Sequence, residues 1–311
     1  MIQFPIDNLL DEDKCYDFLK NLLHPNGFGC PNGHNLATTQ APHKQQNRPA
    51  VVDYRCHCCG RVFNIFTGTV WSGSSHKCST IISILRGFAQ GIPTFHLSQE
   101  LGLDYKTLLD KRHQLQYNAL ENRTKTPLTD QEVETDEMFQ NAGEKGTLHP
   151  DPDDPPRRRG NKKVGLGTME NDRPPIFGAV GRTSGEIRLE VCDNTRQKTI
   201  QPEVEKKTKN TAPIYTDDSP AYNKVSASGR YHATVNHSQK EWARDDDGDG
   251  IREVHCNTME GIWTGLRNFL RLFRGVHKKY LKYYVAMFEW AHNLKTVTNN
   301  FLKAMMIPAS P

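Results

Sequence analysis

The hydrophobic pattern along the first part of the chain changes between helical spacing and short, broken runs. Apolar residues recur at helical intervals from Asp11 to Leu23, and the helix-stopping Pro25-Asn26-Gly27 follows, so one amphipathic helix is predicted there. Between residues 28 and 70 the apolar runs are short and separated by turn residues, which predicts small hairpins that end at Thr67-Gly68-Thr69. A segment this small cannot hold a core unaided, and this favours a metal ion as a staple.

Helical spacing returns between residues 79 and 120, where three helices are predicted. They span 79–90, 94–100 and 104–120, and Asp104 is placed to cap the third. The short turn at Gly102 gives the second and third helices the spacing of a helix-turn-helix. Helical hairpins of this length also occur in proteins that do not bind DNA, so the interpretation as a DNA reader depends on the rest of the chain.

From residue 132 onward the pattern becomes mixed α/β. The predicted elements are strands over 132–139, 175–182, 186–192 and 213–217, a helical crossover over 196–209, and helices over 257–274 and 278–296. Residues 143–163 are a polar interruption that is predicted to be an exposed loop, and residues 308–311 are predicted to be frayed.

Composition sets limits on the class of protein. At 311 residues the chain exceeds the comfortable size of one core, so more than one domain is expected. Hydrophobic residues make up 36% of the chain, too many for a disordered protein. No apolar run approaches the roughly 20 residues that span a bilayer, and residues 1–20 lack the apolar core of a secretion signal. A cytoplasmic protein with no membrane partner is therefore expected. The net charge is only +4, so a polyanionic partner must be argued from local clusters of charge.

Cysteine is concentrated near the N-terminus, where four of the eight cysteines lie between residues 30 and 59. In a chain without a secretory signal this density favours a metal site over disulfides. A Cys-x-x-Cys pair and a Cys-x-x-x-His pair lie about 20 residues apart, the arrangement of a zinc ribbon. The predicted ligands of a structural Zn²⁺ are Cys30, His34, Cys56 and Cys59, and His57 or Cys58 remain alternatives for one of them.

Three acidic motifs follow one another in the second half of the chain: Val133-Glu134-Thr135-Asp136-Glu137, Ile214-Tyr215-Thr216-Asp217 and Asn257-Thr258-Met259-Glu260-Gly261. A lone Asp near the end of a strand is usually a turn or cap residue. Two such positions with a helical Glu downstream could instead converge three carboxylates, an arrangement that is costly unless cations fill it. A pair of Mg²⁺ ions prefers such oxygen ligands and promotes phosphodiester displacement. Phosphoryl transfer on nucleic acid is the leading hypothesis, and spacing alone does not separate Asp217 from Asp218.

The helix predicted over 257–274 carries a basic face. Its residues Arg267, Arg271 and Arg274 fall within about 40° of Glu260 around the axis, while Ile262, Leu266, Phe269 and Phe273 cluster opposite. Residues 261–282 also include Lys278, Lys279 and Lys282 and contain no Asp or Glu. A solvated face would tolerate mixed signs, so uncompensated positive charge beside a carboxylate favours contact with a DNA backbone. The predicted contacts are Arg267, Arg271, Arg274 and Lys278.

Two further features have simpler interpretations. Asp245 to Gly250 begins like a calcium loop, but its twelfth position is Cys256 where an EF-hand needs a Glu, so a tight acidic turn is predicted. Trp242, Trp263 and Trp290 are interpreted as core or interface aromatics in preference to base-stacking platforms.

With these residues in view, the chain resembles the zinc-ribbon DDE transposases of bacterial insertion sequences, the ISXO-type group related to the Merlin elements. The resemblance covers residues 28 to about 293. It is carried by Cys30-Pro31, Tyr54 to Cys59, Phe63 to Thr69, Val133 to Glu137, Thr216-Asp217 with Ala221-Tyr222, Val235-Asn236-His237-Ser238, and Asn257 to Trp263. It implies a multidomain α/β protein in which a zinc ribbon and a helix-turn-helix recognise element ends and precede an RNase H-like mixed-sheet catalytic domain.

The resemblance also implies roles for individual residues. It selects Asp217 over Asp218, and it leaves the third catalytic position open between Glu260 and Asn257. Glu260 is preferred because a carboxylate binds a divalent cation better than an amide does, and because the family's basic residue seven positions on matches Arg267. Asn257, about one turn earlier on the same face, is the alternative.

The expected domains are an N-terminal helix (1–27), a zinc ribbon (28–75), a helix-turn-helix region (76–125) and the DDE catalytic domain (130–300). The expected function is DNA transposition with two Mg²⁺ or Mn²⁺ ions held by Asp136, Asp217 and Glu260. The expected partners are the double-stranded DNA of element ends and target, and a homodimer or higher assembly on that DNA. Two alternatives stay open: a zinc-ribbon DNA-binding regulator with an inactive catalytic domain, and a hydrolytic nuclease of the same fold.

Overall fold

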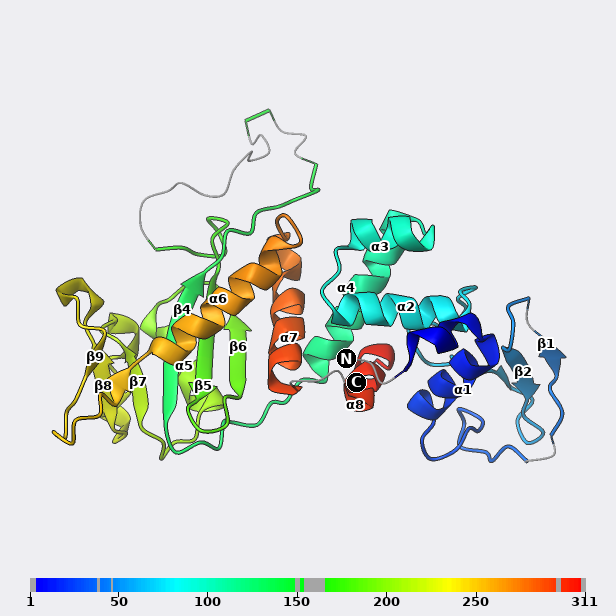
Figure 1. Ribbon diagram of the computed structural model, residues 1–311, viewed down its shortest axis with the longest axis horizontal. Helices are drawn as coiled ribbons and strands as arrows, with labels where there is room; N and C mark the ends of the chain where they lie inside the picture. Colours follow the sequence, from blue (N-terminus) through cyan, green and yellow to red (C-terminus); the bar gives the residue numbers. More distant parts are fainter. Residues whose placement is uncertain are drawn as a thin grey trace. The chain divides into compact units, whose positions relative to one another are not determined.

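The computed structural model describes residues 4–37, 40–45, 47–148, 152–153, 166–294 and 298–308, and the chain divides into two compact units (Figure 1). The first unit comprises Met1–Asn122 and Leu294–Pro311, and the second comprises Arg123–Asn293. Most of the polar loop predicted over 143–163 lies outside the described residues, as do residues 309–311. None of the described helices is both long and apolar enough to cross a bilayer.

The first unit begins with the 3-10 turn η1 (Ile6–Leu10) and the predicted helix α1 (Glu12–Leu23). Asp11 starts α1 as its N-cap, because its carboxylate accepts the backbone N–H groups of Asp13 and Lys14. Short strands β1 (Lys44–Gln45), β2 (Val52–Arg55) and β3 (Val62–Phe63) then form an antiparallel sheet in the order β1-β2-β3. The predicted hairpins are thus confirmed.

The three helices predicted after the hairpins are also present: α2 (Cys78–Ala89), α3 (Thr94–Leu101) and α4 (Tyr105–Glu121). Asp104 caps α4 by accepting the N–H of Thr107 at 2.7 Å. Gly102 ends α3 with φ of 62°, a left-handed conformation that glycine adopts without strain. The helix-turn-helix spacing is therefore realised in the backbone, and its use in reading DNA stays a prediction.

A further helix of the first unit, α8 (Asn299–Met306), was not predicted. It packs against α4 and α1 and buries Phe301, Leu302, Met305 and Met306. The side-chain amide of Asn118 on α4 donates to the Met305 carbonyl at 2.8 Å. The end of the chain is thereby part of the core of the N-terminal unit.

The second unit is built on a five-stranded mixed sheet in the order β6-β5-β4-β7-β8. Strands β4 (Val133–Phe139), β5 (Pro175–Gly181) and β6 (Ile187–Val191) pair antiparallel, whereas β7 (Ile214–Asp217) and β8 (His232–Val235) run parallel to β4. The expected mixed sheet is confirmed, and β8 is an addition that the sequence pattern did not predict.

Helices cover both faces of this sheet, as Figure 1 shows for α6 lying across β4 and β5. On one side α5 (Gln197–Lys207) packs in a core with Phe177 and Ala179 of β5; on the other, α6 (Asn257–Arg271) and α7 (Lys278–Leu294) pack in a core with Ile176 and Val180. The alternation of β5 side chains between two apolar layers explains why the whole strand is buried.

Helix α6 ends three residues earlier than predicted, at Arg271 instead of Arg274. Arg274 has φ of 51° and lies in the following turn, so the helical angle assigned to it from the sequence does not apply. Before α6, strands β9 (Ala243–Arg244) and β10 (Val254–His255) form a hairpin that carries the acidic turn.

Side chains close the outer edge of β6. Glu289 of α7 accepts the N–H of Leu189 at 2.7 Å, and Arg123 donates to the Leu189 carbonyl at 2.8 Å. Asn293 accepts the N–H of Ile187 at 2.8 Å and donates to its carbonyl at 2.9 Å. An edge strand normally exposes these main-chain groups, but here they are bonded within the unit.

Candidate active site

The register of two parallel strands brings together the first two predicted carboxylates. In the pairing of β4 with β7, Val133 lies opposite Ile214 and Glu134 lies opposite Tyr215. Continuing this register by two residues puts Asp136 alongside Asp217. Both side chains are only partly exposed, whereas the neighbouring Asp218 is exposed.

Asp136 is tied to α6 by a tryptophan. The indole N–H of Trp263 donates to Asp136 Oδ2 at 2.7 Å, and the Trp263 side chain is 3% exposed. Gly178 is the residue of β5 paired with Asp136, and a Cβ there would overlap Trp263 and Met259. Glycine is therefore what lets α6 approach the sheet closely enough for the Trp263–Asp136 hydrogen bond.

The start of α6 is anchored by Glu134, a fully buried residue of β4. Its carboxylate accepts the N–H groups of Thr258 at 2.9 Å and Met259 at 3.1 Å, and the Thr258 hydroxyl at 2.9 Å. Arg182 donates to the same carboxylate at 2.9 Å and balances its charge. This anchor fixes the first turn of α6, which carries Asn257 and Glu260, relative to Asp136.

The partly buried carboxylates repel one another electrostatically. Burial raises the pKa of Asp136, and the charge of Glu260 adds to the rise. Burial and the charge of Asp136 raise the pKa of Asp217 to about 6. Glu137 accepts a hydrogen bond from the Tyr222 hydroxyl. The pKa of Glu137 is raised to about 8, chiefly by burial. The group therefore holds more negative charge than its surroundings compensate.

Glu260, on α6, is linked to Asp136 and Asp217 by His237. Its Oε1 lies 3.9 Å from His237 Nε2, and the electrostatic effect of His237 lowers the pKa of both Asp136 and Asp217. Asn257 and Glu260 are both exposed. His237 belongs to a motif that carried the family resemblance, yet the sequence gave it no role in the site.

The donor set fits divalent cations. Carboxylate oxygens are the ligands that Mg²⁺ prefers, and Asp217 Oδ1 is buried without a hydrogen-bond partner among the described residues. Oxygen atoms of Asp136, Asp217 and Glu260 do not all lie within 4.8 Å of one another in the described part of the chain. These three carboxylates therefore do not form a closed cluster of the kind that the cysteine ligands form.

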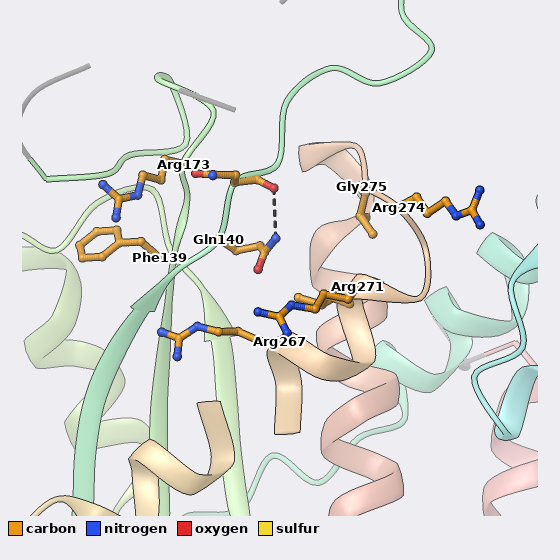
Figure 2. Close-up of a pocket in the computed structure, with 10 residues that line it drawn as sticks. Phe139, Gln140, Arg173, Arg267, Arg271, Arg274 and Gly275 are labelled. Atoms are coloured by element: carbon orange, nitrogen blue, oxygen red, sulfur yellow. Dashed lines mark hydrogen bonds between the residues drawn. The ribbon is translucent and has the colours of Figure 1, made fainter. Parts of the chain in front are cut away.

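A basic pocket of about 650 Å³ lies beyond the carboxylates, at the end of β4 (Figure 2). It is lined by Phe139, Gln140, Asn141, Arg173, Arg267, Leu270, Arg271, Arg274, Gly275 and Val276, none of which is acidic. Figure 2 shows Arg267 and Arg271 reaching from α6 toward the space beneath Gln140, while Arg274 points away from them. Arg173, which the sequence did not single out, lies with its guanidinium 5.1 Å from the ring centre of Phe139.

The fourth predicted DNA contact, Lys278, has a different environment. Its ammonium group lies 2.9 Å from Glu144 and 3.1 Å from Asp172, and these acids are among the hydrogen-bonded and charged neighbours that raise its pKa. The positive charge of Lys278 is thus already balanced by two carboxylates of the second unit.

The four predicted zinc ligands come together in the first unit. One ligand atom from each of Cys30, His34, Cys56 and Cys59 lies within 4.8 Å of all the others. The Cys30 and Cys59 sulfurs are 3.6 Å apart, and Cys56 Sγ lies 3.5 Å from His34 Nδ1. Tetrahedral zinc at its usual bond lengths requires ligand separations of about 3.6–3.8 Å. The Cys₃His cluster therefore fits a zinc ribbon.

The backbone around this cluster favours thiolates. Backbone N–H groups lower the pKa of Cys56 to about 7, with that of Cys59 contributing most, and the N–H of Arg61 is the main cause of a lowered pKa at Cys59. Burial raises the pKa of Cys30. The alternatives His57 and Cys58 are exposed and are not in the cluster.

The acidic turn between β9 and β10 is present as predicted. Asp245 accepts the N–H groups of Gly248 at 2.6 Å and Gly250 at 2.9 Å, which closes the turn. Oxygen atoms of Asp245, Asp247 and Glu253 lie within 4.8 Å of one another. Exposed acidic groups of this kind are common without an ion.

Comparison with known proteins gives a consistent set of relatives. Residues 128–293 match a family described as the ISXO2-like transposase domain. An uncharacterized protein in transposable element ISH50 of Halobacterium salinarum is 26% identical over 287 residues, which cover 92% of each chain.

Similarity to solved structures is more distant. The HTLV-2 integrase catalytic core domain in complex with magnesium is 12% identical with a TM-score of 0.31, over 57% of this chain and 92% of its own. The pre-cleavage Mos1 transpososome is 10% identical with a TM-score of 0.22, over 65% of this chain and 76% of its own.

Proposed function

Because the chain belongs to the ISXO2-like transposase family, we propose that it is a DNA transposase that cuts phosphodiester bonds at insertion-sequence ends and joins the freed ends to target DNA. The observation that best supports this is the convergence of Asp136 and Asp217 on neighbouring parallel strands, with Glu260 on the helix above them. The strand order β6-β5-β4-β7-β8 supports an RNase H-like catalytic domain.

Asp136, Asp217 and Glu260 would hold two divalent cations, Mg²⁺ or Mn²⁺. When bound, such ions supply Lewis-acid stabilisation of the charge that develops on the phosphodiester oxygens. The unpartnered, buried Asp217 Oδ1 and the raised pKa values of Asp136 and Asp217 support a cationic occupant. Glu260 is preferred to Asn257 as the third ligand because it is a carboxylate and faces His237, which also acts on the other two acids.

The protein's own groups would position these acids and the DNA. Trp263 holds Asp136 through its indole N–H, and Glu134 holds the first turn of α6. Arg173, Arg267, Arg271 and Arg274 offer a surface for backbone phosphates, which bind guanidinium groups strongly and without regard to sequence. Lys278 would reach phosphate only by leaving Glu144 and Asp172, so its contribution to DNA contact is expected to be smaller.

The proposed reaction has two displacements. In the first, water attacks the phosphorus at the element end, the P–O3′ bond breaks, and a 3′-hydroxyl and a 5′-phosphate result. In the second, the freed 3′-hydroxyl attacks a phosphorus in target DNA, and a target 3′-hydroxyl leaves. Two ends must be held together for joining, so the active form is proposed to be at least a homodimer on DNA.

In the first unit, the Cys₃His cluster would bind structural Zn²⁺, and α3 and α4 would read element ends as a helix-turn-helix. The zinc ribbon would present this recognition surface by giving the small hairpins a stable fold.

The test uses purified protein, Mg²⁺ and a DNA fragment carrying the gene's own flanks. Site-specific 3′-hydroxyl ends and joined products are expected from the wild type and not from Asp136→Ala. Cutting without joined products would favour a hydrolytic nuclease. Specific binding with no cutting by either protein would favour a DNA-binding regulator and would overturn the catalytic proposal.

A further inference from the structure

An exposed tryptophan stands beside the carboxylate site. Trp242 has 56% of its surface exposed, so the core position that the sequence analysis offered for it is wrong, and an interface position is not tested. Its ring packs on that of His237, with centroids 4.9 Å apart and ring planes at 33°. The exposed indole face offers apolar surface that a flat ligand could cover with a gain in free energy.

His237 connects this indole to the acids. Its Nε2 is 3.9 Å from Glu260, and it interacts electrostatically with Asp136 and Asp217. It lies two residues after the end of β8, in the 3-10 turn η4 (His237–Gln239), and the register puts Val235 at the end of β8 opposite Asp217. A ligand resting on Trp242 would therefore lie next to any phosphate held by the carboxylates.

The loop that carries Trp242 is held by the chain itself. Asn236 accepts the N–H of Gln239 at 3.2 Å, and its own N–H donates to Glu241 at 2.9 Å. Arg244 then binds Glu241 at 2.9 Å and the Thr234 carbonyl of β8 at 3.0 Å. Trp242 follows Glu241 directly, so its exposure is built into an anchored loop, and little ordering is needed when a ligand binds.

The chemistry of the neighbouring site limits what the ligand can be. A strand of DNA whose phosphate reaches the carboxylates carries a base on each flanking nucleotide, and every base has a flat face that stacks on indole. Such stacking contributes about 1–3 kcal/mol per base. A paired base in a duplex has both faces occupied by its neighbours, so only an unpaired or extruded base could use Trp242.

We propose that Trp242 is a stacking platform for an unpaired base flanking the bond that is cut, and that His237 supports the platform from beneath. The inference rests on the proposed transposase function and specifies its substrate: a DNA end that opens at the cut. Lys240, two residues before Trp242, is exposed in the same loop and adds positive charge to it.

The first test is photo-crosslinking. DNA carrying the gene's flanks is made with 5-iodouracil at single positions across the cut and irradiated on the wild-type protein without divalent ion. A cross-link confined to a flanking position and mapped to Trp242 is expected, and it should disappear in Trp242→Ala but persist in Trp242→Phe. Tyr231→Ala removes an aromatic of similar exposure, 54%, in the same unit and should leave the cross-link unchanged.

The second test compares cleavage of a fully paired substrate with one already mismatched at the cut. Trp242→Ala should lose roughly tenfold in rate on the paired substrate, the equivalent of about 1.4 kcal/mol, and no more than about twofold on the mismatched one. Equal losses on both substrates, or no loss on either, would overturn the inference. A cross-link at Trp242 in a protein that cuts neither substrate would support base stacking on Trp242 and reject the catalytic proposal.

Discussion

The two candidate metal sites of this chain are built in opposite ways. The Cys₃His cluster draws its ligands from residues 30 to 59, and its four ligand atoms lie within 4.8 Å of one another. The carboxylate site draws Asp136, Asp217 and Glu260 from two strands and a helix of a larger core, and its oxygens are more widely spread. A closed, local set of ligands suits an ion that holds a small fold together, whereas a wider set on a preformed sheet suits ions that act on a substrate.

The largest effect should come from breaking the cysteine cluster. Cys56→Ser should abolish stoichiometric zinc binding and unfold the hairpin segment, since structural zinc contributes on the order of 10 kcal/mol to folds of this kind. Metal content by mass spectrometry and protease sensitivity of residues 28–75 would measure both. Cys58→Ser alters an exposed cysteine outside the cluster and should retain zinc; loss of zinc in both variants would show that the ligand set is wrong.

A substitution in the carboxylate site should lower activity without destabilising the fold. Asp217→Asn should lower cleavage roughly 1000-fold, about 4 kcal/mol of transition-state stabilisation, while the melting temperature without divalent ion stays the same or rises. The matched control is Asp218→Asn, because Asp218 is exposed and bonds the Asn236 amide at 2.9 Å. If Asp218→Asn were the inactive variant instead, the assignment of the second ligand would have to change.

A smaller effect should follow from moving α6. Gly178→Ala should destabilise the second unit by about 1–3 kcal/mol, because the added methyl group overlaps Trp263 and Met259. Cleavage should fall with it as Trp263 loses its hold on Asp136. Denaturant melts would give the stability change. Gly261→Ala on α6 meets no atom within 4 Å and should be neutral or stabilising by up to about 1 kcal/mol. Equal stability of the two variants would argue against close packing at Gly178.

The smallest effect concerns pH without divalent ions. Burial raises the pKa of Asp217 to about 6 and that of Glu137 to about 8, so the folded form keeps protons that the unfolded chain releases. Stability should therefore fall as pH rises from about 4 toward 8, and divalent ions should reverse the fall. In Asp217→Asn, the part of this fall in stability that lies between pH 4 and 6 should be absent. It amounts to about 1 kcal/mol after allowing for the partial exposure of the side chain. If the wild type and Asp217→Asn lost stability in parallel over this pH range, Asp217 would not be the source of the fall.

The contrast between the sites also explains what the sequence could predict. Spacing predicted the Cys30, His34, Cys56 and Cys59 cluster, because the ligands of a zinc ribbon are close in sequence, and the structure was needed to exclude His57 and Cys58. Asp217 ends β7 as predicted, whereas Asp136 lies in the middle of β4 and not near its end. The choice of Asp217 over Asp218 and of Glu260 over Asn257 came from the family resemblance and stays a prediction. In contrast, Glu134 and Trp263 act through contacts across more than 120 residues, and no local pattern encodes the partner of such a contact.

Elements were missed for similar reasons. Strand β8 has four residues, one of them His232, and it becomes a strand by pairing with β7. Helix α8 carried a signal that could have been used, since Thr298 is an N-cap residue that accepts the N–H of Phe301 at 3.2 Å. The exposure of Trp242 was not predictable, because indole groups are more often buried.

The closed edge of β6 has a consequence for assembly. With the main chain of Ile187 and Leu189 already bonded to Asn293, Glu289 and Arg123, that edge cannot recruit a strand from a second copy. Edge-to-edge association of two copies through β6 would first have to break these hydrogen bonds, which disfavours it. If two copies meet on DNA as proposed, their contact would use surfaces other than this edge of β6.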